Sequence, residues 1–364
     1  MIIQDVINHL EEFTPLDYAE DFDNVGLLVG NKNENLTGIL VTLDTLETIV
    51  DEAIQTKCNL IVSFHPIIFN GLKKITGKTY VERVVLKAIK HDIAIYAIHT
   101  ALDSSFQGVN DMICNQLELI NKHILIPQVQ TIKKLTTFIP KDEAEKLRQA
   151  LFKIGAGNIG NYSNCSFNVE GLGTYKGNDA SHPTKGEKGV FHTEEETQIT
   201  ITFAKHLEGE VLKTLFKSHS YEEVAYEIST LENKNQHIGM GMLGDLKDPM
   251  DEKRFLSYLK NKMNTQVIRH SNLLGKPIKK IAVLGGSGSF AIENAKASGA
   301  DVFITADLKY HDFFKAENNM LLADIGHYES EQFTKNLLVA FLTKKITNFA
   351  VVLSKIDTNP VKYF

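Results

Sequence analysis

The chain has 364 residues and a formal net charge of −6, from 39 Lys+Arg against 45 Asp+Glu. Proteins that hold nucleic acid through its phosphates need clustered positive charge, so this balance argues against a nucleic-acid partner. The composition, with 43% hydrophobic and 23% charged residues, is that of a globular protein and excludes wholesale disorder. At roughly 150 residues per domain, the length predicts two or three domains.

Neither a membrane segment nor a disulfide framework is predicted. No apolar run approaches the ~18 to 20 residues that span a bilayer, and the first residues, MIIQDVINHLEEF, carry acids where a signal peptide carries bases. Cys58, Cys114 and Cys165 lie far apart and form no CxxC pair, which favours reduced thiols. We therefore expect a soluble protein of the cytoplasm.

The first 125 residues predict one α/β half. Short β-branched apolar runs alternate with amphipathic segments, a rhythm typical of a mostly parallel sheet with crossover helices. The predicted order is helix 2–13, strand 37–44, helix 47–57, strand 59–66, helix 80–92 and strand 93–100.

Residues 126–235 interrupt this rhythm. They predict strand 133–140, helix 141–155, a glycine-rich stretch over 155–189, strand 197–204, helix 207–219 and strand 224–230. This order is close to the βα, two strands, αβ of a ferredoxin-like split unit, so we interpret this part as an inserted α+β domain. The glycine cluster favours loops and turns over a phosphate cradle, because no helix start follows it closely.

Residues 236–364 predict a second α/β half. Its elements are strand 279–288, helix 290–299, strand 301–307, helix 308–319 and strand 320–327. Ligands of open parallel sheets collect beyond the carboxyl ends of the strands. Four strand ends from the two halves carry histidine or carboxylate: His65; His99 with Asp103; Asp307 with His311; and His327 with Glu331.

His327 and Glu331 are four residues apart, so they share one face if they belong to a helix. Imidazole and carboxylate without thiolate favour zinc, iron or manganese, and a carboxylate can bridge two ions. A lone histidine after a strand is more often a structural group, but its repetition at four strand ends weakens that alternative. From spacing alone, a metal site and a set of structural histidines both stay open.

Two glycine-containing segments have a functional and a structural interpretation. GGSGS at residues 285–289 joins a strand to a helix, where backbone N–H groups can hold a phosphate, but it lacks the full nucleotide-binding patterns. A tight turn is an equal alternative there. The segment DFDNVGLLVG, near residue 21, favours polar turn residues before a strand.

Together, the motifs resemble the Nif-three-like family, whose members are also called GTP cyclohydrolase I type-two homologues. The matching segments, in family order over nearly the whole chain, are AEDFDNVGLLVG (19–30), VSFHPIIF (62–69), IHTALD (98–103), HSYEEVAYEI (219–228), GGSG (285–288), TADLKYHD (305–312) and GHYESE (326–331). Each is weak alone, but seven in order make a specific match.

The resemblance implies two α/β halves (1–125 and 236–364), with 126–235 as a PII-like or CutA-like insertion of the kind found as a lid in long bacterial members. It also implies a hexameric ring with a dinuclear metal site in each subunit. Carried onto matching positions, the metal ligands are His65, Asp103, His327 and Glu331, with Glu331 as the bridge. His99, Asp307 and His311 become positioning or proton-transfer residues.

The chain departs from the family at position 64. Two adjacent histidines typically precede the proline, but here the first is Phe64, which cannot coordinate a metal. The second ion is therefore in question, and we expect one or two ions per subunit.

Our leading hypothesis is a metal-dependent hydrolase, in which metal-bound hydroxide acts on a nucleotide or phosphoester. His99 or His311 would move protons, and Ser287 with backbone N–H groups near Gly286 would hold phosphate. GTP as substrate rests on the family name alone. The alternatives are a non-catalytic metal-binding, metal-delivery or regulatory protein, and a scaffold with structural histidines.

Overall fold

The computed structural model describes residues 1–364, and the chain divides into two compact units. One unit contains residues 1–127 and 236–364, and the other contains residues 128–235. The two predicted α/β halves thus form a single unit. No helix combines the length and apolar character that a membrane crossing requires.

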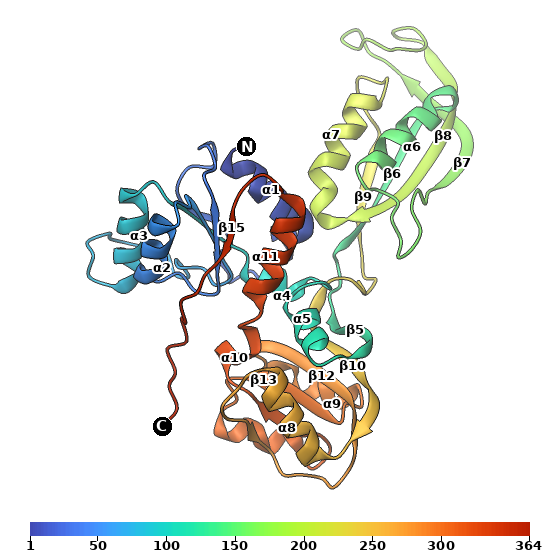
Figure 1. Ribbon diagram of the computed structural model, residues 1–364. Helices are drawn as coiled ribbons and strands as arrows, with labels where there is room; N and C mark the ends of the chain where they lie inside the picture. The colour runs from blue at the N-terminus through green and yellow to red at the C-terminus, as the bar shows by residue number, and fades with distance from the viewer. The chain divides into compact units, whose positions relative to one another are not determined.

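A five-stranded sheet forms the amino-terminal side of the first unit. Its order is β1 (Gly26–Val29), β4 (Ala94–Ala97), β3 (Leu60–Ser63), β2 (Ile39–Thr42) and β15 (Val351–Leu353). All neighbours are parallel except β1 and β4. Buried side chains place two helices on each face, α1 (Ile3–Phe13) and α11 (Thr334–Lys345) on one, α2 (Glu47–Gln55) and α3 (Tyr80–Lys90) on the other (Figure 1). The predicted parallel sheet is confirmed.

A six-stranded sheet forms the other side of this unit. Its order is β11 (Arg269–His270), β14 (Leu321–Asp324), β13 (Val302–Ala306), β12 (Ile278–Ser287), β10 (Gly239–Met250) and β5 (Ile120–Pro127). The three strands β12, β13 and β14 are parallel. One buried cluster joins the two sheets, since it contains Val41 and Val62 from the first and Val283 and Ile304 from the second.

Helices cover both faces of the second sheet. Side chains of α5 (Val109–Gln116) and α8 (Glu252–Lys262) belong to the core shared with the first sheet, whereas α9 (Ile292–Ala297) packs on the opposite face. Two short helices, α4 (His99–Ser104) and α10 (His327–Glu331), directly follow strands β4 and β14. The helix predicted over 308–319 is instead a 3-10 helix, Tyr310–Ala316, and shorter 3-10 turns lie at Leu16–Tyr18, Lys141–Glu143, Lys205–Leu207 and Ser289–Ala291.

The unit of residues 128–235 has the predicted ferredoxin-like order. Its elements are β6 (Ile132–Pro140), α6 (Ala144–Lys153), β7 (Phe167–Lys176), β8 (Phe191–Ala204), α7 (Glu208–Ser218) and β9 (Tyr226–Leu231). The antiparallel sheet runs β7-β8-β6-β9. Helices α6 and α7 pack on the face that presents Leu135 and Ile199. The prediction of loops and turns over 155–189 was wrong for β7, because backbone pairing with β8 overrides the weak strand preference of Gly171 and Gly173.

Candidate metal centre

Three side chains from two sheets meet at one point. His65 follows β3, His327 begins α10 after β14, and Glu331 ends α10. One ligand atom from each lies within 4.8 Å of the others. The Nε2 atoms of His65 and His327 are each 3.2 Å from Glu331 Oε2. The four-residue spacing on α10 therefore does place His327 and Glu331 on one face.

A carboxylate orients each imidazole through its Nδ1 atom. Asp44 Oδ1 lies 2.8 Å from Nδ1 of His65, and Asp307 Oδ2 lies 2.7 Å from Nδ1 of His327. With Nδ1 bound to a carboxylate, the Nε2 atom of each ring faces the cluster. Carboxylate–histidine pairs of this kind fix the ring and its tautomer in metal sites.

Without a metal ion, the electrostatics of the three residues favour positively charged imidazoles and a negatively charged Glu331. Burial lowers the pKa of His65, but the hydrogen bond to Asp44 and the charge of Glu331 outweigh it and raise the pKa to about 10. His327 behaves likewise, with Asp307 and Glu331 raising its pKa to about 11 against the effect of burial. Burial raises the pKa of Glu331, but the two imidazoles lower it to about 2. Because metal ligation needs neutral imidazoles, protons and a cation compete for this site.

Two buried carboxylate oxygens make no well-aligned hydrogen bond here: Asp103 Oδ1, and Glu331 Oε2, which has only the two Nε2 atoms at 3.2 Å. Burial and the charge of Glu331 raise the pKa of Asp103 well above its usual range. A buried acceptor without a donor is costly, and a divalent cation between imidazole nitrogens and carboxylates removes that cost. The residues present therefore fit a metal ion. Asp103 lies outside the set of three mutually close ligand atoms, so its coordination stays a prediction.

His99 lies beside the cluster and is held by a residue that the sequence analysis had placed in a polar turn. Its ring centroid is 5.1 Å from that of His65, and Asp23 Oδ1 is 2.9 Å from its Nδ1. Asp23 also accepts hydrogen bonds from the backbone N–H and hydroxyl of Thr100. Burial raises the pKa of Asp23, but the bonds from His99 and Thr100 lower it to about 2.

The predicted phosphate-binding residues have partners inside the protein. Ser287 donates its hydroxyl hydrogen to Asp307, and Gly286 donates its N–H to Ser330 Oγ at 2.9 Å. Gly286 has φ +68°, and a Cβ there would lie 2.5 Å from Glu331 Oε1. Glycine is thus required for the close approach of the loop to Glu331. Phosphate binding by Gly286 and Ser287 stays a prediction.

His311 makes no contact with His65, His327 or Glu331. It is exposed in the 3-10 helix, with its ring centroid 5.2 Å from Tyr310 and 6.1 Å from Phe314. Its role in proton transfer stays a prediction. Phe64, in contrast, is fully buried, with its ring centroid 4.9 Å from that of His65 and 5.4 Å from that of His99. The apolar ring fills core space next to the site.

A cavity of about 350 Å³ opens beside the cluster. His65 and His327 line it, together with Arg269, Tyr328 and carboxyl-terminal residues such as Tyr363. Asp44 was not predicted as a site residue, although it lies two residues after β2 and obeys the strand-end rule that predicted His65. Asp23 was not predicted either, and the strand-end rule offers no signal for it because Asp23 precedes its strand.

The fold and the site define an α/β protein with a histidine–carboxylate cluster where strands of two sheets end. The chain belongs to the DUF34/NIF3 family, since the family model, described as Duf34/NIF3 (NGG1p interacting factor 3), matches residues 1–360. This confirms the resemblance seen in the motifs.

Named relatives match the chain from end to end. A Bacillus subtilis protein named GTP cyclohydrolase 1 type 2 homolog is 38% identical, over 99% of this chain and 98% of its own length. A Staphylococcus epidermidis protein of the same name is 35% identical, over 100% of both chains. The crystal structure of a Bacillus cereus protein related to NIF3 is similar with a TM-score of 0.86 and 35% identity, over 100% of this chain and 99% of that one.

Proposed function

We propose that the chain is a metal-dependent hydrolase whose divalent ion is bound by His65, His327, Glu331 and Asp103. The observation that carries this is the pair of Nε2 atoms, both 3.2 Å from one buried oxygen of Glu331. The donor set favours zinc, iron or manganese. When bound, such an ion lowers the pKa of a water to about 7 and supplies a nucleophile at neutral pH.

The surrounding residues support this chemistry in separate ways. Asp44 and Asp307 keep the Nδ1 atoms engaged, so each Nε2 lone pair is directed to the ion. His99, whose Nδ1 is held by Asp23, presents its other nitrogen as a proton carrier beside His65. The cavity of about 350 Å³ has room for a small substrate next to the ligands.

The substrate class that we propose is a nucleotide or phosphoester. The relatives' name points to GTP, whereas the ligand set suits phosphoester hydrolysis equally well. We further propose that the protein acts in the cytoplasm as a hexamer. Because Phe64 supplies no ligand, we propose that each subunit binds one ion tightly and a second one weakly.

The test combines elemental analysis with a turnover screen. Purified protein should contain zinc, iron or manganese, and should hydrolyse at least one compound in a panel of nucleotides and phosphoesters. Removal of the ion with a chelator should abolish that turnover, and the ion should restore it. Bound metal without turnover on the whole panel would support the alternative, a metal-binding or metal-delivery protein. Metal content at trace level would contradict both.

A further inference from the structure

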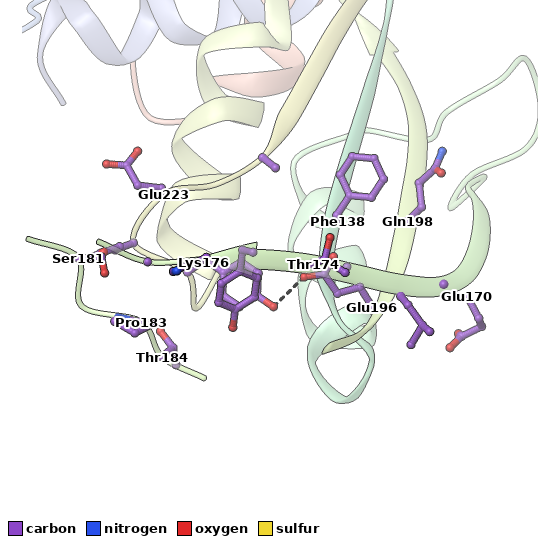
Figure 2. A pocket seen from close by; sticks show the side chains of 18 of the residues that line it. Phe138, Glu170, Thr174, Lys176, Ser181, Pro183, Thr184, Glu196, Gln198 and Glu223 are labelled. Carbon is purple, nitrogen blue, oxygen red and sulfur yellow. Dashed lines mark hydrogen bonds between the residues drawn. The ribbon is translucent and has the colours of Figure 1, made fainter. Parts of the chain in front are cut away.

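A second cavity, independent of the metal centre, lies within the unit of residues 128–235. Its volume is about 570 Å³, within the range of small-molecule sites. Strand register places Phe138, Gln198 and Glu196 on the sheet face opposite Leu135 and Ile199, which face the helices. These three side chains line the cavity together with residues of β7 and the segment 181–184 (Figure 2).

Glu196 is the unusual residue of this cavity. It is only 9% exposed, and its Oε1 accepts a hydrogen bond from the Tyr221 hydroxyl at 2.7 Å, drawn as a dashed line in Figure 2. No donor in the chain reaches its Oε2, and no cation pairs with it. A Cβ at Gly173 would lie 2.1 Å from this Oε2, so the carboxyl group occupies the space that a side chain would fill.

Tyr221 remains a hydrogen-bond donor to this carboxyl group. Burial and the charge of Glu196 both raise the pKa of Tyr221, so its hydroxyl remains a donor. Two other acids of the cavity have local partners, since Glu170 pairs with Lys141 at 3.0 Å and Glu222 accepts the N–H of His182 at 2.6 Å. A largely buried carboxylate without a counter-ion carries a desolvation cost that a bound cation repays.

Aromatic rings form the walls around Glu196. Tyr175 and Tyr221 meet edge to face with centroids 5.9 Å apart, and Phe138 lines the same cavity. Ring faces attract cations and accept flat apolar groups. No imidazole and no thiolate line the cavity, so its chemistry favours an organic ligand over a transition metal ion.

We propose that this cavity binds a small organic cation, whose N–H group donates to Glu196 Oε2 and whose apolar body lies among Phe138, Tyr175 and Tyr221. The ligand class is an amine, amidine or guanidine on a ring-sized apolar group. Glu196, oriented by the Tyr221 hydroxyl, favours a positively charged ligand, and the aromatic rings favour a flat apolar group. Gly173 keeps the space that the carboxyl group needs.

Titration calorimetry on the full chain tests the proposal with benzamidine, neutral benzamide and anionic benzoate as probes. Wild type should bind benzamidine about tenfold or more tightly than benzamide, the ratio that one charge-assisted hydrogen bond supplies. Benzoate should not bind. Glu196→Gln should remove the preference for benzamidine, while Glu195→Gln, the same change at the exposed neighbouring residue, should keep it.

A second variant guards against a folding defect in the first. Gly173→Ala leaves the charge unchanged but places a methyl group where the carboxyl group lies, so it should also weaken benzamidine binding. Thermal unfolding checks that both variants fold. Glu331→Gln should bind benzamidine as wild type does, which separates this cavity from the metal centre. Equal affinity for benzamidine and benzamide, unchanged binding by Glu196→Gln, or no binding at millimolar benzamidine would each overturn the proposal.

Discussion

The proposed metal centre should depend most on Glu331, because its Oε2 is the common neighbour of both Nε2 atoms. Glu331→Gln replaces the anion with a neutral amide of the same shape. We expect bound metal to fall several-fold while the thermal unfolding curve stays cooperative. Glu329→Gln on the same helix, outside the set of three ligand atoms, should keep its metal. Elemental analysis of both variants gives the answer, and unchanged metal in Glu331→Gln would remove this residue from the site.

We propose that Phe64 limits the number of ions that the site holds. We expect wild type to keep one ion per subunit after dialysis, and Phe64→His to keep more, because an imidazole returns at the end of β3. Since Phe64 is fully buried, the exchange should lower the free energy of unfolding by about 1 to 2 kcal/mol. Phe64→Leu is the control, with a packing loss but no added nitrogen. Two tightly held ions in wild type would refute the role given to Phe64.

Asp23 should make the free energy of unfolding fall at low pH. Its pKa of about 2 in the folded protein is below the usual value of a carboxyl group, so its contribution is complete above about pH 4 and is lost as the pH falls through 2. Between pH 5 and pH 2, the free energy of unfolding of wild type should fall by roughly 2 kcal/mol more than that of Asp23→Asn. Urea unfolding at both pH values measures this difference. Parallel pH curves for the two proteins would show that Asp23 makes no such contribution.

At the scale of elements, the insertion leaves and re-enters the first unit through paired strands. Pro127 of β5 is the register partner of Gly239 of β10, and the N–H of Asn235 donates to the carbonyl of Gln128 at 2.8 Å. The two ends of the insertion are therefore already adjacent. A short linker can join them without strain.

Replacement of residues 128–235 by a short Gly/Ser linker should leave a folded protein that still binds metal, because His65, His327 and Glu331 all belong to the other unit. Circular dichroism and elemental analysis check both parts of this expectation. Several linkers of different length serve as controls for the join itself. Insoluble protein from all of them would show that the first unit needs the insertion to fold.

At the scale of the whole molecule, the hexamer proposal predicts a mass. Large apolar side chains remain exposed on β7 and β8, among them Phe167 and Phe191 at 71% and 66%. Contacts between chains commonly cover surfaces of this kind. Light scattering after gel filtration should give about six times the 40.7 kDa of one chain, and should do so at two protein concentrations. The mass of a single chain at both concentrations would refute the hexamer.

The sequence by itself determined many of the local elements, and it predicted the three side chains that meet at the candidate metal centre. Buried β-branched runs such as 39–42 and 60–63 predict strands because their side chains must leave water on both faces of a parallel sheet. The end of β3 predicted His65, the end of β14 predicted His327 and Glu331, and the spacing on α10 placed the latter two on one face. Position 64 was recognised as a departure from the family because it is phenylalanine where the family typically has histidine.

Only the tertiary structure decided which side chains act together. Asp44 and Asp23 are 21 and 76 residues away from the histidines that they hold, and pairing over such distances follows from sheet order and not from any local pattern. His311 satisfied the same strand-end rule as its neighbours, yet its 3-10 helix leaves it in solvent beside Tyr310. Gly171 and Gly173 predicted a turn but belong to strand β7. Their low strand propensity is a small effect compared with the complete ladder of backbone hydrogen bonds to β8.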